Sequence, residues 1–415
     1  MENYKIHELR EKDFDDYFRI VRNAYPGLAI KDQEKFVSYL KNTTRNNLST
    51  HFYGCFHHNK LRGGMRLHDF NLNLNYHLVN AGGIGFIAVD MLHKKEKVCK
   101  AIMDFFHQHY LAQKIPFLVL YAFRPDFYAD MGFGMATTMH KYVIEPRAFP
   151  RSTSKSHLVF ADSSDLEKIL EYHNAQAKRT HGMILRQESD FKMFFNNPEY
   201  NIVAFQDKNR YRGYLIFKFN KVHQNNFVIN DMEIYELLYD EAPVLNEFCF
   251  FMNSQSDQIN RIILYSQDEY LHFKLNDIRN NTGNLYPPVF HESYSSGLGM
   301  MFKITDLHEY FAMISPAVDK SLSGTFKFTI SDSFIGQYNR SLVIKFKNGK
   351  AFISSKNQFD TELKTDISYF SSIAIGALTV VKAWELGLIE ISDTNYITGL
   401  QKIFPAAKPQ CTIWF

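Results

Sequence analysis

Three lysines stand at the junction between a predicted strand and a predicted helix. The strand covers Gly82–Val89, and the apolar periodicity of a helix begins at Val98. The free N–H groups of a helix N-terminus attract phosphate, and Lys94, Lys95 and Lys97 add positive charge at the same place. We therefore expect this junction to bind a pyrophosphate group. A solvated, lysine-rich turn without a ligand is the alternative.

A tyrosine precedes a pair of glycines near the end of the first third of the chain. Tyr128 follows an apolar run, Phe117–Phe123, that is interrupted by an Arg-Pro pair. Gly132 and Gly134 come next, and glycine readily adopts the left-handed conformation that ends a helix. The pattern predicts a buried strand, a one-turn helix that carries Tyr128, and a bulged return strand.

The end of the chain also carries a chemical signal. The last residues, Ile413-Trp414-Phe415, would expose three apolar side chains unless they are buried. Burial of the terminus also desolvates its α-carboxylate, which raises the pKa of that group above about 3.5 and makes it a better base. An ordinary docked terminus with its carboxylate at the rim is the alternative.

The remaining reactive side chains do not form a recognisable centre. The four cysteines lack the spacing of a metal site or of a disulfide framework, which favours a reducing compartment. The pairs His57-His58 and His107/His109 have no carboxylate or thiol partner in the sequence, so we expect no metal site. Cys99 falls in the helix after the lysines, and we expect it to be no nucleophile.

Composition bounds the class of protein. The chain has 415 residues, 45% of them hydrophobic, and a net charge of only +3, so we expect a globular protein of two to three domains that does not bind nucleic acid. The N-terminus carries no signal-peptide pattern. The longest apolar run, Ile373–Val381, is too short to span a membrane, where roughly 18–20 residues are needed. A cytoplasmic location with no membrane partner is expected.

The order of predicted elements suggests three domains. Residues 1–150 read as a strand, two helices, three antiparallel strands, then helix, strand, helix and strand. Residues 151–295 restart a similar order, but the equivalent strand-to-helix junction, Tyr235–Glu247, is acidic and would repel a pyrophosphate. An unrelated α+β domain is the alternative there. Residues 296–415 read as a small α+β domain with a long helix over Ile367–Leu386.

This three-part plan, the segment Met131–Thr138 after Phe127-Tyr128, and the terminal aromatic residue together resemble the Eis (enhanced intracellular survival) type N-acetyltransferases. The resemblance implies two tandem GNAT acetyltransferase-like domains, the second degenerate, and a sterol-carrier-like domain, assembled as a hexamer. It also implies transfer of an acetyl group from acetyl-CoA to an amine of an aminoglycoside, a polyamine or a lysine.

The resemblance assigns roles by position. Tyr128 would be the general acid that protonates the CoA thiolate, and the carboxylate of Phe415 the base that removes the amine proton. The acetyl-CoA site would comprise Ile87, Ala88, Val89, Lys94, Lys95, Lys97 and Val98. Three positions depart from the family pattern. Lys97 and Cys99 stand where the two loop glycines are expected, and Trp414 replaces an acidic residue of the aminoglycoside-acetylating relatives.

We therefore predict an acetyl-CoA-dependent amine N-acetyltransferase that works by direct attack in a ternary complex, without a metal. Asp32 and Glu34 are the acidic residues expected near the acceptor side. The alternative is a binding protein: a CoA-binding pseudoenzyme, or a carrier of an apolar ligand in the C-terminal domain.

Overall fold

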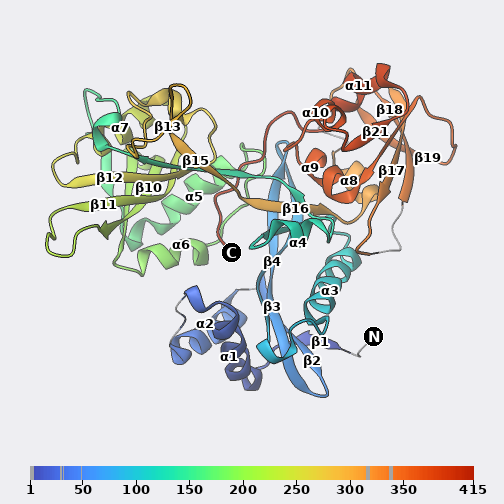
Figure 1. The fold of residues 1–415 in the computed structure, drawn as a ribbon, viewed down its shortest axis with the longest axis horizontal. Coiled ribbons are helices and arrows are strands. Elements are labelled where there is room, and N and C mark those ends of the chain that lie inside the picture. Colours follow the sequence, from blue (N-terminus) through green and yellow to red (C-terminus); the bar gives the residue numbers. More distant parts are fainter. Residues whose placement is uncertain (1–3, 29, 31, 48, 315–317, 336–339) are drawn as a thin grey trace. The chain divides into compact units, whose positions relative to one another are not determined.

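In the computed structural model, the chain divides into two compact units (Figure 1). The structure describes residues 4–28, 30, 32–47, 49–314, 318–335 and 340–415. Unit 1 comprises residues 1–136, 300–409 and Phe415, and unit 2 comprises residues 137–299 and 410–414. Both units interrupt each other in sequence, so neither is a continuous stretch of chain.

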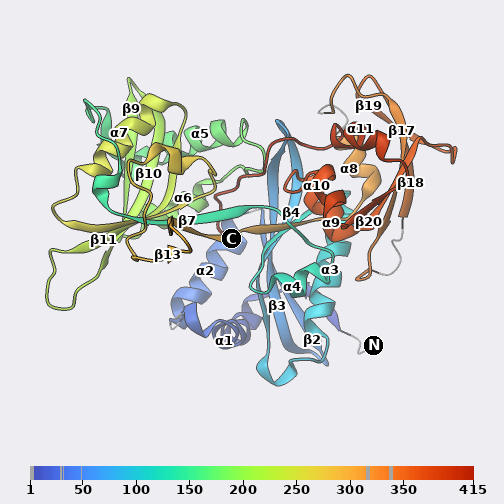
Figure 2. The same cartoon turned by 45° about the horizontal axis from the view of Figure 1, so that its top comes forward.

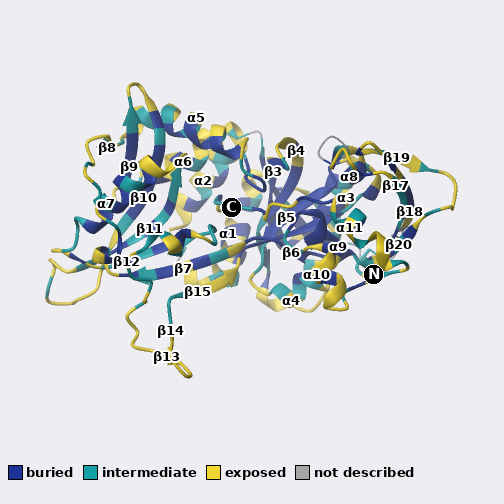
Figure 3. Cartoon of the chain, turned by 90° about the horizontal axis from the view of Figure 1, so that it is seen from above, coloured by how far each residue is buried: buried dark blue, intermediate teal, exposed yellow. Residues whose placement is uncertain are grey.

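The first sheet of unit 1 has seven strands in the order β1-β2-β3-β4-β5-β16-β6. Their bounds are Lys5–Glu8 (β1), Thr50–His57 (β2), Lys60–Leu74 (β3), His77–Val89 (β4), Phe117–Tyr121 (β5), Met300–Ile304 (β16) and Gly134–Met135 (β6). Every residue of β16 is buried, and four of the five in β5 are too, so this side of the sheet belongs to the core (Figure 3).

Four helices accompany this sheet: α1 (Phe14–Ala24), α2 (Gln33–Asn46), α3 (Val98–Ala112) and α4 (Pro125–Ala129). The expected amphipathic face of α1 is buried through Phe14, Tyr17, Phe18 and Val21. Asp32 begins α2 as its N-cap, because its carboxylate accepts the N–H of Lys35 at 2.9 Å. These helices follow the strand and helix order predicted from the sequence.

The rest of unit 1 is a five-stranded sheet with helices on one face (Figure 2). Its strands are, in spatial order, β19 (Lys350–Ser354), β18 (Arg340–Lys347), β17 (Gly324–Ser331), β20 (Thr361–Asp366) and β21 (Ile389–Ile391). The helices are α8 (Leu307–Ile314), α9 (Ile367–Ala374), α10 (Val380–Glu385) and α11 (Ile397–Gln401). The prediction of one helix over 367–386 is wrong, since Gly376 adopts a φ of 75° and Thr379 caps a second helix.

Unit 2 repeats the arrangement of the first sheet, in the order β15-β7-β12-β11-β10-β9-β8. The strands are β15 (Tyr294–Leu298), β7 (Thr138–Ile144), β12 (Ile259–Ser266), β11 (Asn230–Tyr239), β10 (Arg210–Lys221), β9 (Tyr200–Asp207) and β8 (Leu158–Phe160), with a separate hairpin of β13 (Leu285–Tyr286) and β14 (Phe290–His291). The helices are α5 (Leu166–Ala177), α6 (Glu188–Phe195) and α7 (Ala242–Asn253).

The boundaries between the two units differ from the domain boundaries predicted from the sequence. Strand β7 pairs with β12 in the sheet of unit 2, so the chain leaves unit 1 after residue 136 rather than at 150. Strand β16 pairs with both β5 and β6, so the chain returns to unit 1 at residue 300. Strand partners more than 110 residues away in the sequence decide these boundaries, and local sequence patterns do not reveal them.

Candidate active site

Strands β4 and β5 separate at a bulge in the middle of the first sheet. They pair in parallel from Ala81 opposite Phe117 to Ile84 opposite Leu120, and the pairing stops there. Two residues later Phe86 adopts a φ of 47°, and the register between β3 and β4 shifts at the same point. A non-glycine residue in this conformation marks a bulge. The carboxyl half of β4 therefore has one edge that β5 does not cover.

The backbone groups after the bulge point in defined directions. Asp90 donates its N–H to the Arg62 carbonyl on β3 at 2.8 Å. In a strand, the backbone N–H and C=O groups of alternate residues point toward the same neighbouring strand. Those of Ala88 therefore also point toward β3, and those of Val89 point away from it. The Ile87 carbonyl accepts the Tyr25 hydroxyl at 2.8 Å. Of Ile87, Ala88 and Val89, which are predicted to belong to the acetyl-CoA site, Val89 therefore has the backbone groups best placed to bind a ligand.

The predicted pyrophosphate site has the geometry of an open helix N-terminus. Lys97 adopts a left-handed φ of 64°, and its side chain does not cap α3. The first helical bond runs from the Ala101 N–H to the Lys97 carbonyl, so the preceding N–H groups have no partner within the helix. Lys94, Lys95 and Lys97 are exposed, whereas the Val98 side chain is buried in the core, so only its backbone could contact a ligand.

The left-handed conformation explains why the family pattern has glycine where this chain has Lys97. Glycine adopts that conformation without strain, and a lysine adopts it at a cost of about 1 kcal/mol. The loop before α3 is held from the side, since Tyr4 donates its hydroxyl to the Glu96 carbonyl at 2.7 Å and Glu96 pairs with His93 at 2.8 Å. The loop is therefore shaped before any ligand arrives.

Tyr128 lies on α4 with only 2% of its surface exposed. Burial raises the pKa of its phenol, and the neighbouring Cys99 and Tyr25 raise it further. Its hydroxyl has no hydrogen-bond partner among the described residues. The phenol is thus protonated at neutral pH and lies near both the first turn of α3, through Cys99, and the β4 bulge, through Tyr25.

The turn after α4 is fixed from two sides. Gly132 takes the expected left-handed conformation, with a φ of 85°, and the Phe133 N–H returns to the Tyr128 carbonyl at 3.0 Å. The buried Lys303 of β16 donates to the Met131 carbonyl at 2.7 Å. The return strand predicted after the two glycines is present as β6, and no bulge is seen in its two residue pairs with β16.

Phe415 packs onto the same sheet. Its ring lies 4.9 Å from Phe70, 5.4 Å from His68 and 5.3 Å from Tyr121, measured between ring centroids. Its carboxyl carbon is 3.3 Å from the position that a Cβ atom on Gly85 would occupy. The structure therefore places the terminal carboxyl group on β4, one residue before the bulge. Phe415 is half-buried, whereas Trp414 is 56% exposed.

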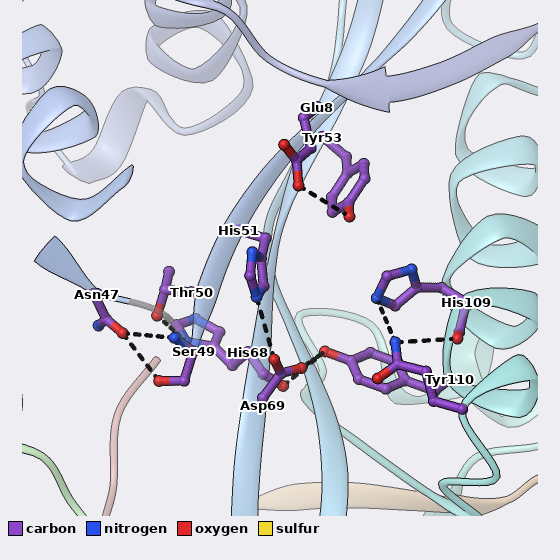
Figure 4. A network of polar contacts seen from close by, with 11 residues as sticks. Glu8, Asn47, Ser49, Thr50, His51, Tyr53, His68, Asp69, His109 and Tyr110 are labelled. Carbon is purple, nitrogen blue, oxygen red and sulfur yellow. Dashed lines mark hydrogen bonds and ion pairs between the residues drawn. The ribbon is translucent and has the colours of Figure 1, made fainter. Parts of the chain in front are cut away.

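A polar network holds the part of β3 against which Phe415 packs (Figure 4). His68 contacts the Thr50 hydroxyl at 3.2 Å, and the Tyr110 hydroxyl donates to the His68 carbonyl and to Asp69, both at 2.9 Å. Asp69 also pairs with His51 at 3.2 Å. Burial holds the pKa of His68 well below its usual value, with a further contribution from Arg66, so its imidazole is neutral.

Sequence reasoning missed several residues of this site. Arg66 and His68 share a face of β3, and Gly85 and Gly83 lie opposite them on β4. A glycine within a strand can mark a close approach of other chain segments, so the glycines of β4 were the available signal. By contrast, Asp32 and Glu34 are exposed on α2, and Asp32 is engaged as a helix cap.

The other reactive groups found from the sequence are accounted for separately. Burial raises the pKa of Cys99 to about 11, so its thiol is protonated and a poor nucleophile. The Nδ1–H of His107 donates to the Met103 carbonyl at 2.8 Å inside the core, and burial lowers the pKa of His107 to about 3. Within the described ranges, no three His, Cys, Asp or Glu side chains gather to hold a metal ion, and no helix has the length and apolar character to cross a membrane.

In unit 2 the equivalent pair of strands also separates, and there a segment of the chain itself lies beside the gap. Strands β11 and β12 pair in parallel up to Ile234 opposite Leu264 and then diverge. The C-terminal segment 410–412 binds there: Gln267 exchanges two hydrogen bonds with Cys411, and Arg186 donates to the Thr412 carbonyl at 2.9 Å. A cavity of about 230 Å³ remains beside this segment. The chain itself thus fills part of the gap.

The comparisons with known proteins agree with this geometry. Residues 5–136 match the family model of the acetyltransferase (GNAT) domain, and residues 310–412 match that of the sterol carrier protein domain. No curated protein matches the chain. GNAT domains use acetyl-CoA.

Solved structures share the fold over the whole chain. A GCN5-related N-acetyltransferase from Anabaena variabilis is 16% identical with a TM-score of 0.82, and Eis1 from Mycobacterium abscessus is 14% identical with a TM-score of 0.74; both alignments cover all of each chain. A probable N-acyltransferase from Enterococcus faecalis, 17% identical over all of both chains, has a TM-score of 0.79. The chain therefore carries a GNAT acetyltransferase domain at residues 5–136 and a sterol carrier protein domain at residues 310–412, and it shares its fold with solved N-acetyltransferases that include Eis1.

Proposed function

We propose that the chain transfers the acetyl group of acetyl-CoA to a primary amine by direct attack in a ternary complex. The amine nitrogen forms a bond to the thioester carbonyl carbon, and the carbon–sulfur bond then breaks. An aminoglycoside, a polyamine or a lysine side chain is the proposed acceptor. Because Cys99 is protonated and buried, the proposal requires no covalent enzyme intermediate.

The carboxylate of Phe415 is the proposed base. A lysine-type amine has a pKa near 10.4, so it is mostly protonated at neutral pH and must lose a proton before or during attack. The position of the carboxyl group on Gly85 supports this role, since Gly85 directly follows the last residue of β4 that pairs with β5. His68 packs against the Phe415 ring, and burial holds the pKa of its imidazole well below the usual value.

Tyr128 is the proposed acid, which returns a proton to the departing thiolate. Its raised pKa keeps the hydroxyl protonated, and the absence of a described hydrogen-bond partner leaves that hydroxyl available to a ligand. Backbone N–H groups beside a bulge are suited to the oxyanion that forms during attack. We propose Val89 for the pantetheine arm and the backbone of the 94–98 loop, with its three lysines, for the pyrophosphate.

Unit 2 is proposed to bind no cofactor. Its junction after β11 is acidic, and its own C-terminal segment occupies the strand gap through Gln267 and Arg186. The hexameric assembly and the cytoplasmic location stay predictions from the sequence.

One observation carries the proposal: the terminal carboxyl group lies on β4 beside the bulge of a GNAT domain. The test measures CoA thiol release from acetyl-CoA with kanamycin, spermidine and a lysine peptide. It compares the native chain with a chain extended by one glycine after Phe415, which moves the carboxylate about 3.8 Å along the backbone. Activity that is present in the native chain and collapses in the extended chain is the expected result.

Other outcomes separate the alternatives. Equal activity of both chains would remove Phe415 from the mechanism but leave the acetyltransferase. If neither chain acetylates an amine while acetyl-CoA still binds, the chain is a CoA-binding pseudoenzyme.

A further inference from the structure

Arg66 is a buried cation without a carboxylate side chain as partner. Only 8% of the residue is exposed, its Nη1 donates to the Tyr39 hydroxyl at 2.6 Å, and its guanidinium lies 4.5 Å from the centre of the Phe86 ring. Its buried Nε has no hydrogen-bond partner among the described residues. None of the described Asp or Glu side chains forms an ion pair with it. A buried charge without a counter-ion is costly, so this group is expected to have an anion nearby.

The carboxyl group of Phe415 lies beside Gly85, as does the Arg66 guanidinium. A Cβ atom placed on Gly85 would lie 3.4 Å from Arg66 Nη2, 3.3 Å from the Phe415 carboxyl carbon and 3.4 Å from its oxygen. The guanidinium and the carboxyl group therefore flank the same point of β4, and only the missing side chain of Gly85 leaves the space between them open.

We propose that Arg66 is a positioning residue that holds the terminal carboxylate of Phe415 at the β4 bulge and keeps it ionised. The part of this inference that concerns catalysis rests on the proposed function. The electrostatic part concerns only the two groups and stands without it.

The described side chains whose rings pack against Phe415 carry no charge. His68 on β3 is neutral because burial lowers its pKa, and Tyr121 approaches from β5. Two further phenols lie near Arg66. Burial raises the pKa of Tyr25, which directly follows α1, to about 12, and Tyr39 on α2 is the hydrogen-bond partner of Arg66. Phenols are neutral near pH 7, so Arg66 supplies the charge that acts on the carboxylate.

Titration of the carboxylate tests the inference without any enzyme assay. The full chain is labelled with [1-13C]phenylalanine, and the terminal resonance is assigned by its loss when Phe415 is deleted. An opposite charge within about 4–6 Å lowers a carboxyl pKa by about 1–3 units. We therefore expect the titration midpoint to rise by about 1–3 pH units in Arg66→Gln and to stay close to native in Arg66→Lys, which keeps the charge.

Two further variants guard against trivial effects. Arg279→Gln removes an exposed arginine of unit 2 that pairs with Asp277, and it should leave the midpoint unchanged. Gly85→Ala inserts a methyl group between the two partners and should also raise the midpoint, so the inference stays testable if Arg66→Gln does not fold. An unchanged midpoint in Arg66→Gln, or in Gly85→Ala where only that variant folds, would overturn the proposal.

Activity gives an independent readout. The acid limb of the kcat/KM profile should move to higher pH in Arg66→Gln by the same interval as the NMR midpoint, whereas the KM for acetyl-CoA should change little. If the native chain acetylates no amine, the proposed function fails, and the titration still decides whether Arg66 holds the carboxylate. A shifted midpoint with an unshifted activity profile would overturn the catalytic part alone.

Discussion

Replacing Glu236 by glutamine should strongly destabilise unit 2. The Glu236 carboxylate on β11 accepts from both terminal nitrogens of Arg186, at 2.7 and 3.1 Å, and each side chain is only 3% exposed. Burial by itself would lower the pKa of Arg186, but the carboxylate outweighs it and raises that pKa. Glutamine keeps the shape and removes the counter-charge. Because an arginine stays protonated, the cost of the uncompensated charge is about 3–5 kcal/mol.

The loss of stability can be measured by urea unfolding with a single tryptophan as the fluorescent probe. The sequence contains two tryptophans, so Trp384→Phe leaves Trp414, in the segment that belongs to unit 2, as the only one. With an m value of about 2–3 kcal/mol/M, the loss corresponds to a midpoint lower by about 1–2 M urea.

The control for this experiment is Glu199→Gln, which removes an exposed carboxylate of the same unit. The double variant Arg186→Met/Glu236→Leu replaces the pair by apolar side chains and should recover much of the loss. If Glu236→Gln and Glu199→Gln unfold at the same urea concentration, the reasoning about the buried pair is refuted.

Three further predictions concern the GNAT domain of unit 1. Tyr128→Phe should lower kcat by about 10²–10⁴-fold without changing the affinity for acetyl-CoA, as measured by calorimetry and thiol release; an unchanged kcat would remove the tyrosine from the mechanism. Changing the three lysines of the loop before α3 to glutamine should weaken acetyl-CoA binding and flatten its salt dependence, and equal salt slopes would argue against the pyrophosphate site. The hydrogen bond to Asp69 raises the pKa of His51. The stabilisation from this pair is therefore present below about pH 6.5 and is lost as the pH rises through the raised pKa. The difference in unfolding free energy between the native chain and His51→Gln should shrink between pH 6 and about pH 9, and a difference that does not depend on pH would contradict this assignment.

Much of the local structure was predictable. The buried face of α1, the one-turn helix of Tyr128 and the left-handed Gly132 follow from periodicity and from glycine placement, which act over a few residues. The strand separation after Ile84 was not visible, because it depends on where two strands far apart in sequence stop pairing. The break at Gly376 was missed, since the apolar pattern runs through it without interruption.

The sequence by itself determined that a loop of three lysines precedes a helix, that a tyrosine precedes a glycine turn, and that the chain ends on an aromatic residue. Each depends on residue type and short spacing. Only the tertiary structure decided that β16 enters the first sheet, that β7 leaves it, and that Arg66 lies across Gly85 from the end of the chain. Those contacts join residues from about 20 to 350 positions apart, and their energy comes from strand pairing and from the burial of charge, which no short window of sequence records.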